Sequence, residues 1–428
     1  MAREYRDSGI EWIGQIPKDW EIGKVKNYYS LQTGFTPDTK NELYYDDNGA
    51  LWVNISDMGD SHYISNTKKR ISNYYIAKFN PTIVPKGSLL YSFKLSVGTV
   101  AIAGEEMYTN EAIAAFLQED GINLPFLYYS SQVCIIFNAN ENIYGAKLLN
   151  QDLINNATII FPPLAEQQKI ADYLDKVCGE VDEMVALQET MIEELKAYKQ
   201  SVITEAVIKG LNPNVPMRDS GIDWIGEIPE HWSTTKIKKI ARTNSGSTPR
   251  NISDGENSNI VWIRTTDIND DVVYDSSLHL TSEEYSSASC PMLDEGTCVV
   301  AMYGGGGTIG KSGMLGVKAT INQALCSMEV GDSFTGEYLF CILRSVRYYW
   351  MKYAVGTRKD PNINQEIVRN MIIPFPPIDE QRAIATYLDT KCSEIDSLID
   401  LKQAKIEELK EYKKSVIYEY VTGKKEVI

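Results

Sequence analysis

An internal repeat constrains this chain more than any other feature of its sequence. The pattern D-S-G-I-x-W-I-G-x-I-P-x-x-W occupies residues 7–20 and returns at 219–232, a shift of 212 residues. A second pattern, F-P-P-x-x-E-Q, occurs at 161–167 and again at 375–381. Between these anchors the two halves differ much more. Two long copies indicate duplication of a two-part unit and exclude a solenoid, which stacks several short repeats.

The second part of each copy has the pattern of a long helix. Its apolar positions alternate in steps of four and three, which is typical of a coiled-coil seam. We expect the first helix to run from about Glu166 to Lys209 and to stop at Gly210, and the second to be capped by Asp379. The predicted seams are Ile170, Leu174, Val177, Val181, Met184, Gln188, Met191, Leu195, Tyr198 and Val202 in the first helix, and Ile384, Leu388, Ile395, Leu398, Leu409, Tyr412 and Val416 in the second, interrupted by Lys391, Lys402 and Lys405.

Two such helices in one chain favour pairing with each other. Antiparallel pairing would place the two globular modules at opposite ends of a rod, related by an approximate two-fold axis. The modules themselves have the pattern of mixed α/β structure, with strands expected at 88–93 and 297–303 and short helices at 124–137 and 336–353. The predicted fold class is therefore α+β, with modules at 1–160 and 212–375 and long helices at 161–211 and 376–428 joined as an antiparallel coiled coil.

Charge and composition narrow the function. The net charge of −16 excludes a protein that coats nucleic acid with a generally basic surface, because such affinity comes from many Lys and Arg contacts to phosphate. Seven cysteines without a C-x-x-C pair and only three histidines predict a reducing compartment and no zinc site. The N-terminal residues lack the apolar core of a signal peptide and no stretch is long enough for a membrane helix, so we expect a cytoplasmic protein.

One sequence motif could indicate an enzyme that binds a nucleotide. Residues 305–312 satisfy the phosphate-loop pattern G-x-x-x-x-G-K-S, which would make the chain a nucleotide-binding protein. However, Gly313 and Gly316 follow where a helix should begin, so a glycine-rich hairpin is the preferred interpretation. We find no methyltransferase or nuclease motif and no catalytic residue. Two alternatives remain at this point: nucleotide binding through Gly305–Ser312, and a coiled-coil adaptor without a role on DNA.

Basic side chains gather locally despite the acidic average, at 68–70, 236–242 and 344–359. Polar loops such as 248–251 have the Thr, Asn and Arg side chains that suit base-edge and phosphate contacts. The repeated Trp12, Trp20, Trp224 and Trp232 are expected to be core anchors where a module meets the helices.

Together these features resemble the specificity subunit of type I restriction-modification systems. The resemblance rests on the two anchor patterns, on the helix ending E-E-L-K-x-Y-K-x-S-V-I, and on the presence of both copies, and it covers essentially the whole chain. It implies that each module is a target recognition domain for one half of a bipartite double-stranded DNA site. The paired helices would set the spacing and dock two modification (methyltransferase) subunits.

The resemblance also implies where the chemistry lies. This chain would carry no cofactor: S-adenosylmethionine would bind the adenine-methylating partner, and ATP and Mg would bind separate restriction subunits. The expected partner-binding residues are Glu180, Glu183, Glu193 and Glu194. The expected DNA-binding residues are Lys40, Lys68, Lys69, Arg70, Lys94 and Lys147 in the first module, and Arg250, Arg264, Lys311, Arg358 and Lys359 in the second.

Overall fold

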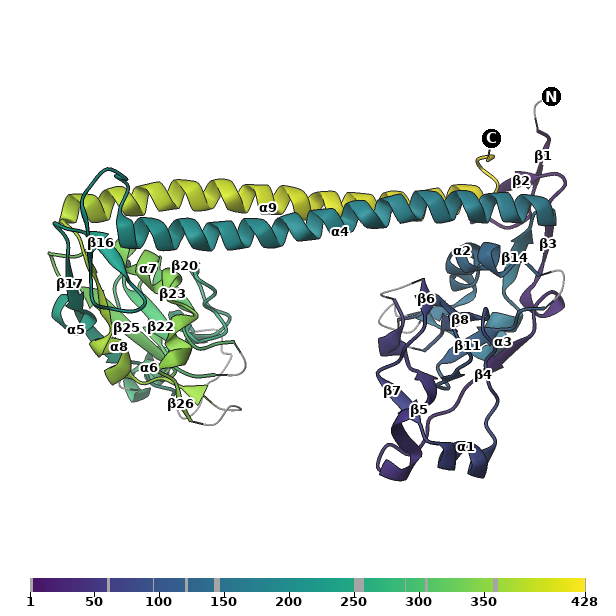
Figure 1. Ribbon diagram of the computed structural model, residues 1–428, viewed down its shortest axis with the longest axis horizontal. Helices are drawn as coiled ribbons and strands as arrows, with labels where there is room; N and C mark the ends of the chain where they lie inside the picture. Colours follow the sequence, from purple (N-terminus) through teal and green to yellow (C-terminus); the bar gives the residue numbers. More distant parts are fainter. Residues whose placement is uncertain are drawn as a thin grey trace. The chain divides into compact units, whose positions relative to one another are not determined.

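The computed structural model describes residues 3–59, 62–94, 96–119, 122–141, 147–249, 258–288, 290–304, 307–356 and 361–427. The chain forms two compact units, one made of residues 1–188 with 404–428 and the other of residues 189–403. Each unit contains one globular module and a stretch of both long helices (Figure 1). The succession of elements in the first module is repeated in the second, which confirms the duplication and the α+β class predicted from the sequence.

The first module is built on a five-stranded and a three-stranded sheet. The larger sheet has the order β4-β11-β8-β9-β6 and the smaller the order β10-β5-β7. Most neighbours are antiparallel, while β6 with β9 and β10 with β5 are parallel. The elements are β1 (Tyr5–Asp7), β2 (Gln15–Pro17), β3 (Glu21–Lys24), η1 (Val25–Asn27), β4 (Leu31–Thr33), η2 (Glu42–Tyr44), β5 (Tyr45–Val53), η3 (Ile55–Asp57), β6 (Tyr63–Ile64), β7 (Lys69–Ile71), α1 (Asn73–Phe79), β8 (Leu89–Ser92), β9 (Val100–Ala103), β10 (Tyr108–Thr109), β11 (Ile113–Phe116), α2 (Leu124–Cys134), η4 (Ile136–Asn138), β12 (Asn140–Glu141), β13 (Lys147–Leu148), α3 (Gln151–Asn155) and β14 (Thr158–Phe161).

The second module has the same strand orders, β18-β25-β22-β23-β20 and β21-β19-β24. The strands and short helices expected near 88, 297, 124 and 336 are confirmed as β8, β22, α2 and α7. The elements are β15 (Met217–Asp219), β16 (Glu227–Pro229), β17 (Ser233–Lys236), α5 (Ile237–Ile240), β18 (Ala241–Ser245), β19 (Ile260–Ile263), β20 (Asp271–Val273), β21 (His279–Leu280), α6 (Ser282–Ala288), β22 (Cys298–Ala301), β23 (Ser312–Leu315), β24 (Thr320–Ile321), β25 (Leu325–Val330), α7 (Gly336–Ser345), η5 (Tyr349–Lys352), β26 (Val355–Gly356), β27 (Pro361–Asn362), α8 (Gln365–Asn370) and β28 (Ile372–Phe375).

The central strand of each larger sheet is buried on both faces. In β8, Leu89 and Tyr91 pack into one hydrophobic cluster with Leu127 of α2, while Leu90 packs into another with Ala101. Side chains alternate between the faces of a strand, so a run that is apolar at every position indicates a sheet covered on both sides. In the first unit α2 and β14 lie next to the long helices, and β5, β7 and α1 lie at the far end (Figure 1).

The long helices are α4 (Leu164–Lys209) and α9 (Ile378–Val421), and they pair antiparallel within each unit. In the first unit Tyr173 packs on Tyr420 with ring centroids 4.5 Å apart, and Lys413 Nζ lies 2.7 Å from Asp182 Oδ1. In the second unit Lys402 Nζ lies 3.1 Å from Met191 Sδ, and Lys199 Nζ lies 2.6 Å from Asp396 Oδ2. In both units the partner number falls as the number in α4 rises, which confirms the predicted antiparallel pairing.

The predicted seam is wrong in part. Met184 and Tyr198 are 45% and 59% exposed, and Leu398 and Tyr412 are also exposed. The other predicted seam positions are buried or half-buried. In the middle of the helices, the seam defined by burial runs through Val181, Val185, Gln188, Ile192, Leu195 and Lys199 in α4, and through Ile395, Ile399, Lys402, Ile406, Leu409, Lys413 and Val416 in α9.

The physical reason for this difference is that the sequence of α4 contains two adjacent rows of apolar residues, and either row could form the seam. Met184 and Val185, and likewise Met191 and Ile192, are adjacent apolar pairs, and either row alternates in steps of three and four. Packing against the second helix selects the row of Val185 and Ile192. In α9, Lys402 lies half-buried within the seam, whereas Lys405 lies outside it and pairs with Glu408.

The helix ends are explained by local chemistry. Gly210 has a φ of +75°, and its N–H donates to the carbonyl of Ala206 at 3.0 Å, which confirms the predicted stop of α4. The prediction that Asp379 caps α9 from outside is wrong, because the helix begins at Ile378 and Asp379 already lies in its first turn. Among the described residues no helix is both long and apolar enough to cross a membrane.

Candidate nucleic-acid interface

The two repeated anchor patterns form the joint between each module and its helices. Trp20 is buried, and its indole N–H donates to Glu166 Oε2 at 3.0 Å. Trp232 donates in the same way to Glu380 Oε2, also at 3.0 Å. The carboxylates lie in the first turns of α4 and α9, where the helix dipole favours negative charge. The prediction that these two tryptophans are core anchors is confirmed.

The glutamine of each F-P-P-x-x-E-Q pattern fastens the same joint. Gln167 Nε2 donates to the carbonyl of Pro162 at 2.8 Å, and Gln381 Nε2 donates to that of Pro376 at 3.0 Å. Both glutamines are buried. These contacts explain why Glu and Gln recur together after the proline pair: one holds the tryptophan and the other closes the start of the helix.

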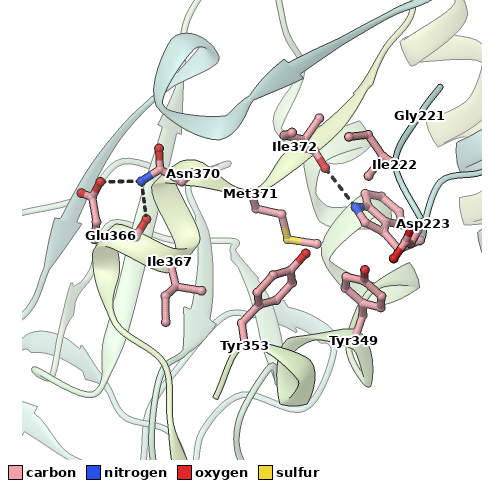
Figure 2. Close-up of a pocket in the computed structure, with 11 residues that line it drawn as sticks. Gly221, Ile222, Asp223, Tyr349, Tyr353, Glu366, Ile367, Asn370, Met371 and Ile372 are labelled. Atoms are coloured by element: carbon pink, nitrogen blue, oxygen red, sulfur yellow. Dashed lines mark hydrogen bonds between the residues drawn. The ribbon is translucent and has the colours of Figure 1, made fainter. Parts of the chain in front are cut away.

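Trp12 and Trp224 are half-buried, and they pack against the hydrophobic clusters that contain Trp20 and Trp232 respectively. Trp224 donates its indole N–H to the carbonyl of Ile372 at 3.1 Å. Beside it a cavity of about 500 Å³ is lined by side chains that include Tyr349, Tyr353 and Met371, as Figure 2 shows. The side chains around this cavity include none of the DNA-binding residues expected from the sequence, so it supports no part of the predicted interface.

The first basic cluster lies at the edge of the smaller sheet of the first module. Lys69 and Arg70 begin β7, and Lys68 precedes them. Lys68 Nζ donates to the carbonyl of Ser56 at 2.7 Å, and the Arg70 guanidinium donates to the carbonyl of Gly49 at 3.1 Å. A polar cleft of about 490 Å³ is lined by these two cations and by Asp47, Asn48, Asn66 and Thr67. The side chains that line the cleft include both hydrogen-bond donors and hydrogen-bond acceptors.

The other three expected lysines of the first module are exposed and lie on different segments. Lys40 lies between β4 and η2, and Lys94 follows β8. Lys147 lies in β13 and forms an ion pair with Glu141 of the antiparallel neighbour β12. Residues 68–70 therefore form one basic cluster, whereas these three lysines lie on other segments of the module.

In the second module Arg264 is held in place by neighbours. Its guanidinium donates to Ser277 Oγ at 2.6 Å, and its backbone N–H donates to Asp267 Oδ2 at 2.8 Å. Burial alone would raise the pKa of Asp267, but hydrogen bonds from Ser277, from the Arg264 backbone and from Ser276 outweigh it and lower the pKa below its usual value. The other expected residues Arg250, Arg358 and Lys359 lie outside the described residues.

The phosphate-loop alternative is not favoured. Ser312 begins strand β23 where a phosphate loop would begin a helix. The Ser312 hydroxyl is buried and donates to Asp270 Oδ1 at 3.0 Å, so it faces the protein and is not free for a metal-bound nucleotide. Lys311 is half-buried, and its backbone N–H donates to the carbonyl of Thr308 at 3.0 Å, which closes the preceding turn.

Two glycines of that motif, at 305 and 306, lie outside the described residues. Across the described ranges, no three His, Cys, Asp or Glu side chains gather as metal ligands.

Sequence reasoning missed one pair of equivalent residues. Glu111 and Gln323 are exposed, and each accepts a hydrogen bond from a threonine hydroxyl of the G-x-T-P segment, Thr36 in the first module and Thr248 in the second. The signal was present as N-E-A at 110–112 and N-Q-A at 322–324, which are also separated by 212 residues.

Two copies of one α/β module, each closed by a long helix and carrying polar and basic loops, define a duplicated recognition protein. The chain belongs to the family of the type I restriction modification DNA specificity domain, whose model matches residues 17–197 and again 229–411.

Relatives that match this chain over most of their own length support this assignment. The specificity subunit of the type I restriction enzyme MjaIX from Methanocaldococcus jannaschii is 24% identical over 384 residues, covering 85% of each chain. The EcoBI specificity subunit from Escherichia coli is 24% identical over 419 residues, covering 93% of this chain and 84% of its own.

Solved structures share the fold. A chain described under "Structural basis underlying complex assembly and conformational transition of the type I R-M system" has a TM-score of 0.71 at 16% identity, with 95% of this chain and 98% of that chain covered. The HsdS subunit from Thermoanaerobacter tengcongensis has a TM-score of 0.51 with the same identity and coverage.

Proposed function

We propose that this chain is the non-catalytic subunit that selects the DNA sequence in a type I restriction-modification complex. The modules at 1–160 and 212–375 each read one half of a bipartite site in double-stranded DNA, and the paired helices set the spacing and dock two modification subunits. Linking two readers raises the effective concentration of the second once the first has bound, so two short recognitions act as one long one.

The observation that carries the proposal is a constant framework with variable loops. The strand orders and the Trp–Glu joints are the same in the two modules, whereas the exposed side chains on the loops differ. Such a division suits a protein whose fold is fixed and whose target is set by loop residues. The DNA-binding residues are assigned as Lys40, Lys68, Lys69, Arg70, Lys94 and Lys147 in the first module, and as Arg250, Arg264, Lys311, Arg358 and Lys359 in the second.

The long helices offer surfaces for the protein partners. On α4 the exposed Glu180 and Glu183 neighbour Met184 and Leu187, which are also exposed. In the second unit the exposed pair at 193–194 precedes the exposed Tyr198 on the same helix. Exposed apolar groups beside acidic ones favour a protein partner with an apolar and basic face. The partner-binding residues are thus assigned as Glu180, Glu183, Glu193 and Glu194.

The chemistry is assigned to those partners. Modification subunits would bind S-adenosylmethionine and methylate adenine, and restriction subunits would use ATP and Mg. The assembly would act in the cytoplasm.

Mapping of methylated adenines tests the proposal. The chain and its modification subunit are expressed in a host that lacks adenine methylation, and the genome is sequenced by a method that detects N6-methyladenine. We expect methylation at one bipartite sequence, and none when the gene for this chain is omitted. The same methylation with and without the chain would contradict the proposal, and a coiled-coil adaptor without a DNA role would then be favoured.

A further inference from the structure

The first module holds one acidic side chain at a fixed place on its surface. The backbone N–H of Phe35 donates to the carbonyl of Thr109, the last residue of β10, at 2.8 Å. A Cβ on the preceding Gly34 would collide with that carbonyl oxygen, so only glycine permits this approach. The approach brings Thr36 beside the turn after β10, where its hydroxyl donates to the carboxylate of Glu111.

The turn that carries Glu111 is itself fixed. The side chain of Asn110 accepts the backbone N–H of Ala112 at 3.0 Å, and the N–H of Asn110 donates to the carbonyl of Val53 at 2.9 Å. An Asx turn of this kind fixes the backbone through Asn110 and Ala112, so the side chain of Glu111 between them is not needed to hold the turn. Glu111 therefore projects to solvent from a rigid support.

The second module repeats the arrangement with a different side chain. Ser247 donates its N–H to the carbonyl of Ile321 at 3.1 Å, and a Cβ on Gly246 would collide with that oxygen. Thr248 then donates to the side-chain oxygen of Gln323. The support is the same, but an amide replaces the carboxylate.

The equivalence extends to the neighbouring loop. Phe93 donates its N–H to the carbonyl of Ala112 at 3.0 Å, so Lys94 follows directly beside the turn. The hydrogen bond from Thr36 is the main cause that lowers the pKa of Glu111, with a further contribution from Lys94, so this carboxylate is ionised at neutral pH. In the second module Met302 donates to the equivalent carbonyl, and the residue that follows it is the exposed Tyr303.

We propose that Glu111 and Gln323 are equivalent base-reading residues, each facing a base that carries an exocyclic amino group. This inference rests on the proposed function. An ionised carboxylate accepts hydrogen bonds only and repels phosphate, so on DNA it suits the amino group of cytosine or adenine. A glutamine both donates and accepts and suits the amino group and N7 of adenine. The matched supports provide one such reader in each module.

Exchange of the two side chains tests the inference. Glu111→Gln and Gln323→Glu are prepared in the full chain with its modification subunit, together with Glu105→Gln as a control. Glu105 is an exposed acidic residue that precedes the first residue of β10, and its carboxylate pairs with Lys86. Methylated sequences are mapped in cells, and binding is measured on duplexes in which each position of both half-sites is varied in turn.

We expect each variant to change the preferred base at one position, by about ten-fold or more, in one half-site. The two variants should affect different halves, and Glu105→Gln should leave both unchanged. An unchanged motif, or an equal loss on all sequences, would overturn the inference, because the latter marks a structural role. If the wild-type chain directs no methylation, the proposed function itself has failed; if it does and the variants match it, only this inference has failed.

Discussion

At the scale of single residues, hydrogen-bonded carboxylates organise both modules. Glu166 and Glu380 hold the indoles of Trp20 and Trp232, and Asp267 gathers the loop around the Arg264 backbone. The repeats in the sequence were sufficient to predict that the tryptophans are anchors. They were not sufficient to single out the carboxylate at position 111, because its place depends on a contact between segments more than 70 residues apart.

Replacing Asp267 with asparagine should reduce stability in a pH-dependent way. The pKa of Asp267 is lower in the folded chain than its usual value of 3.8, so its contribution is present above that value and is lost as the pH falls through the folded pKa. We expect the free energy of unfolding of the variant to be lower by about 1 to 2 kcal/mol at about pH 5 to 7, with the difference shrinking below about pH 4.

Urea unfolding of both proteins across this pH range measures the effect. Asp294→Asn is the matched control, since Asp294 is exposed and pairs with Lys318 at the surface. A difference that stays constant from neutral pH to well below the usual pKa would show that the charge of Asp267 does not contribute.

At the scale of elements, the sequence predicted two long antiparallel helices correctly and misplaced part of their seam. Periodicity shows that a helix has an apolar stripe, but adjacent apolar pairs such as Met191 and Ile192 leave two rows to choose from. Strand order was not predictable either, because it depends on pairings between segments far apart in the sequence.

The corrected seam makes a quantitative prediction for α4. Ile192 is 6% exposed, so Ile192→Ala should cost about 2 to 5 kcal/mol of unfolding free energy. Tyr198 belongs to the row predicted from the sequence and is exposed. Tyr198→Ala should therefore lower the unfolding free energy by less than about 0.5 kcal/mol. Chemical unfolding of both variants compares them, and equal losses would restore the predicted row.

At the scale of the whole molecule, the charge of −16 acquires a more specific meaning. The helix segment 161–211 carries five basic and ten acidic side chains, while the modules keep their basic groups in local clusters. An acidic chain whose basic side chains occur only in small local clusters should bind the DNA phosphates weakly on its own. A partner that supplies basic surface would then provide most of the affinity for DNA.

Salt dependence of DNA binding tests this division of roles. We expect the isolated chain to bind a duplex weakly, with a shallow slope of log affinity against log salt, and the complex with the modification subunit to bind tightly with a steep slope. Fluorescence anisotropy on the same duplex measures both. Equal slopes for the chain and the complex would mean that this protein makes the phosphate contacts itself.

The composition of the two units also bears on the order in which they are completed during synthesis. The α4 residues Ile170, Leu174 and Cys178 of the first unit share a hydrophobic cluster with Val416, Ile417 and Val421 of α9. The second unit is drawn from one continuous stretch, 189–403, whereas the first needs residues beyond 403. The module synthesised first therefore keeps an apolar helix face open until the ribosome has made the end of α9, and it is the last to be sealed.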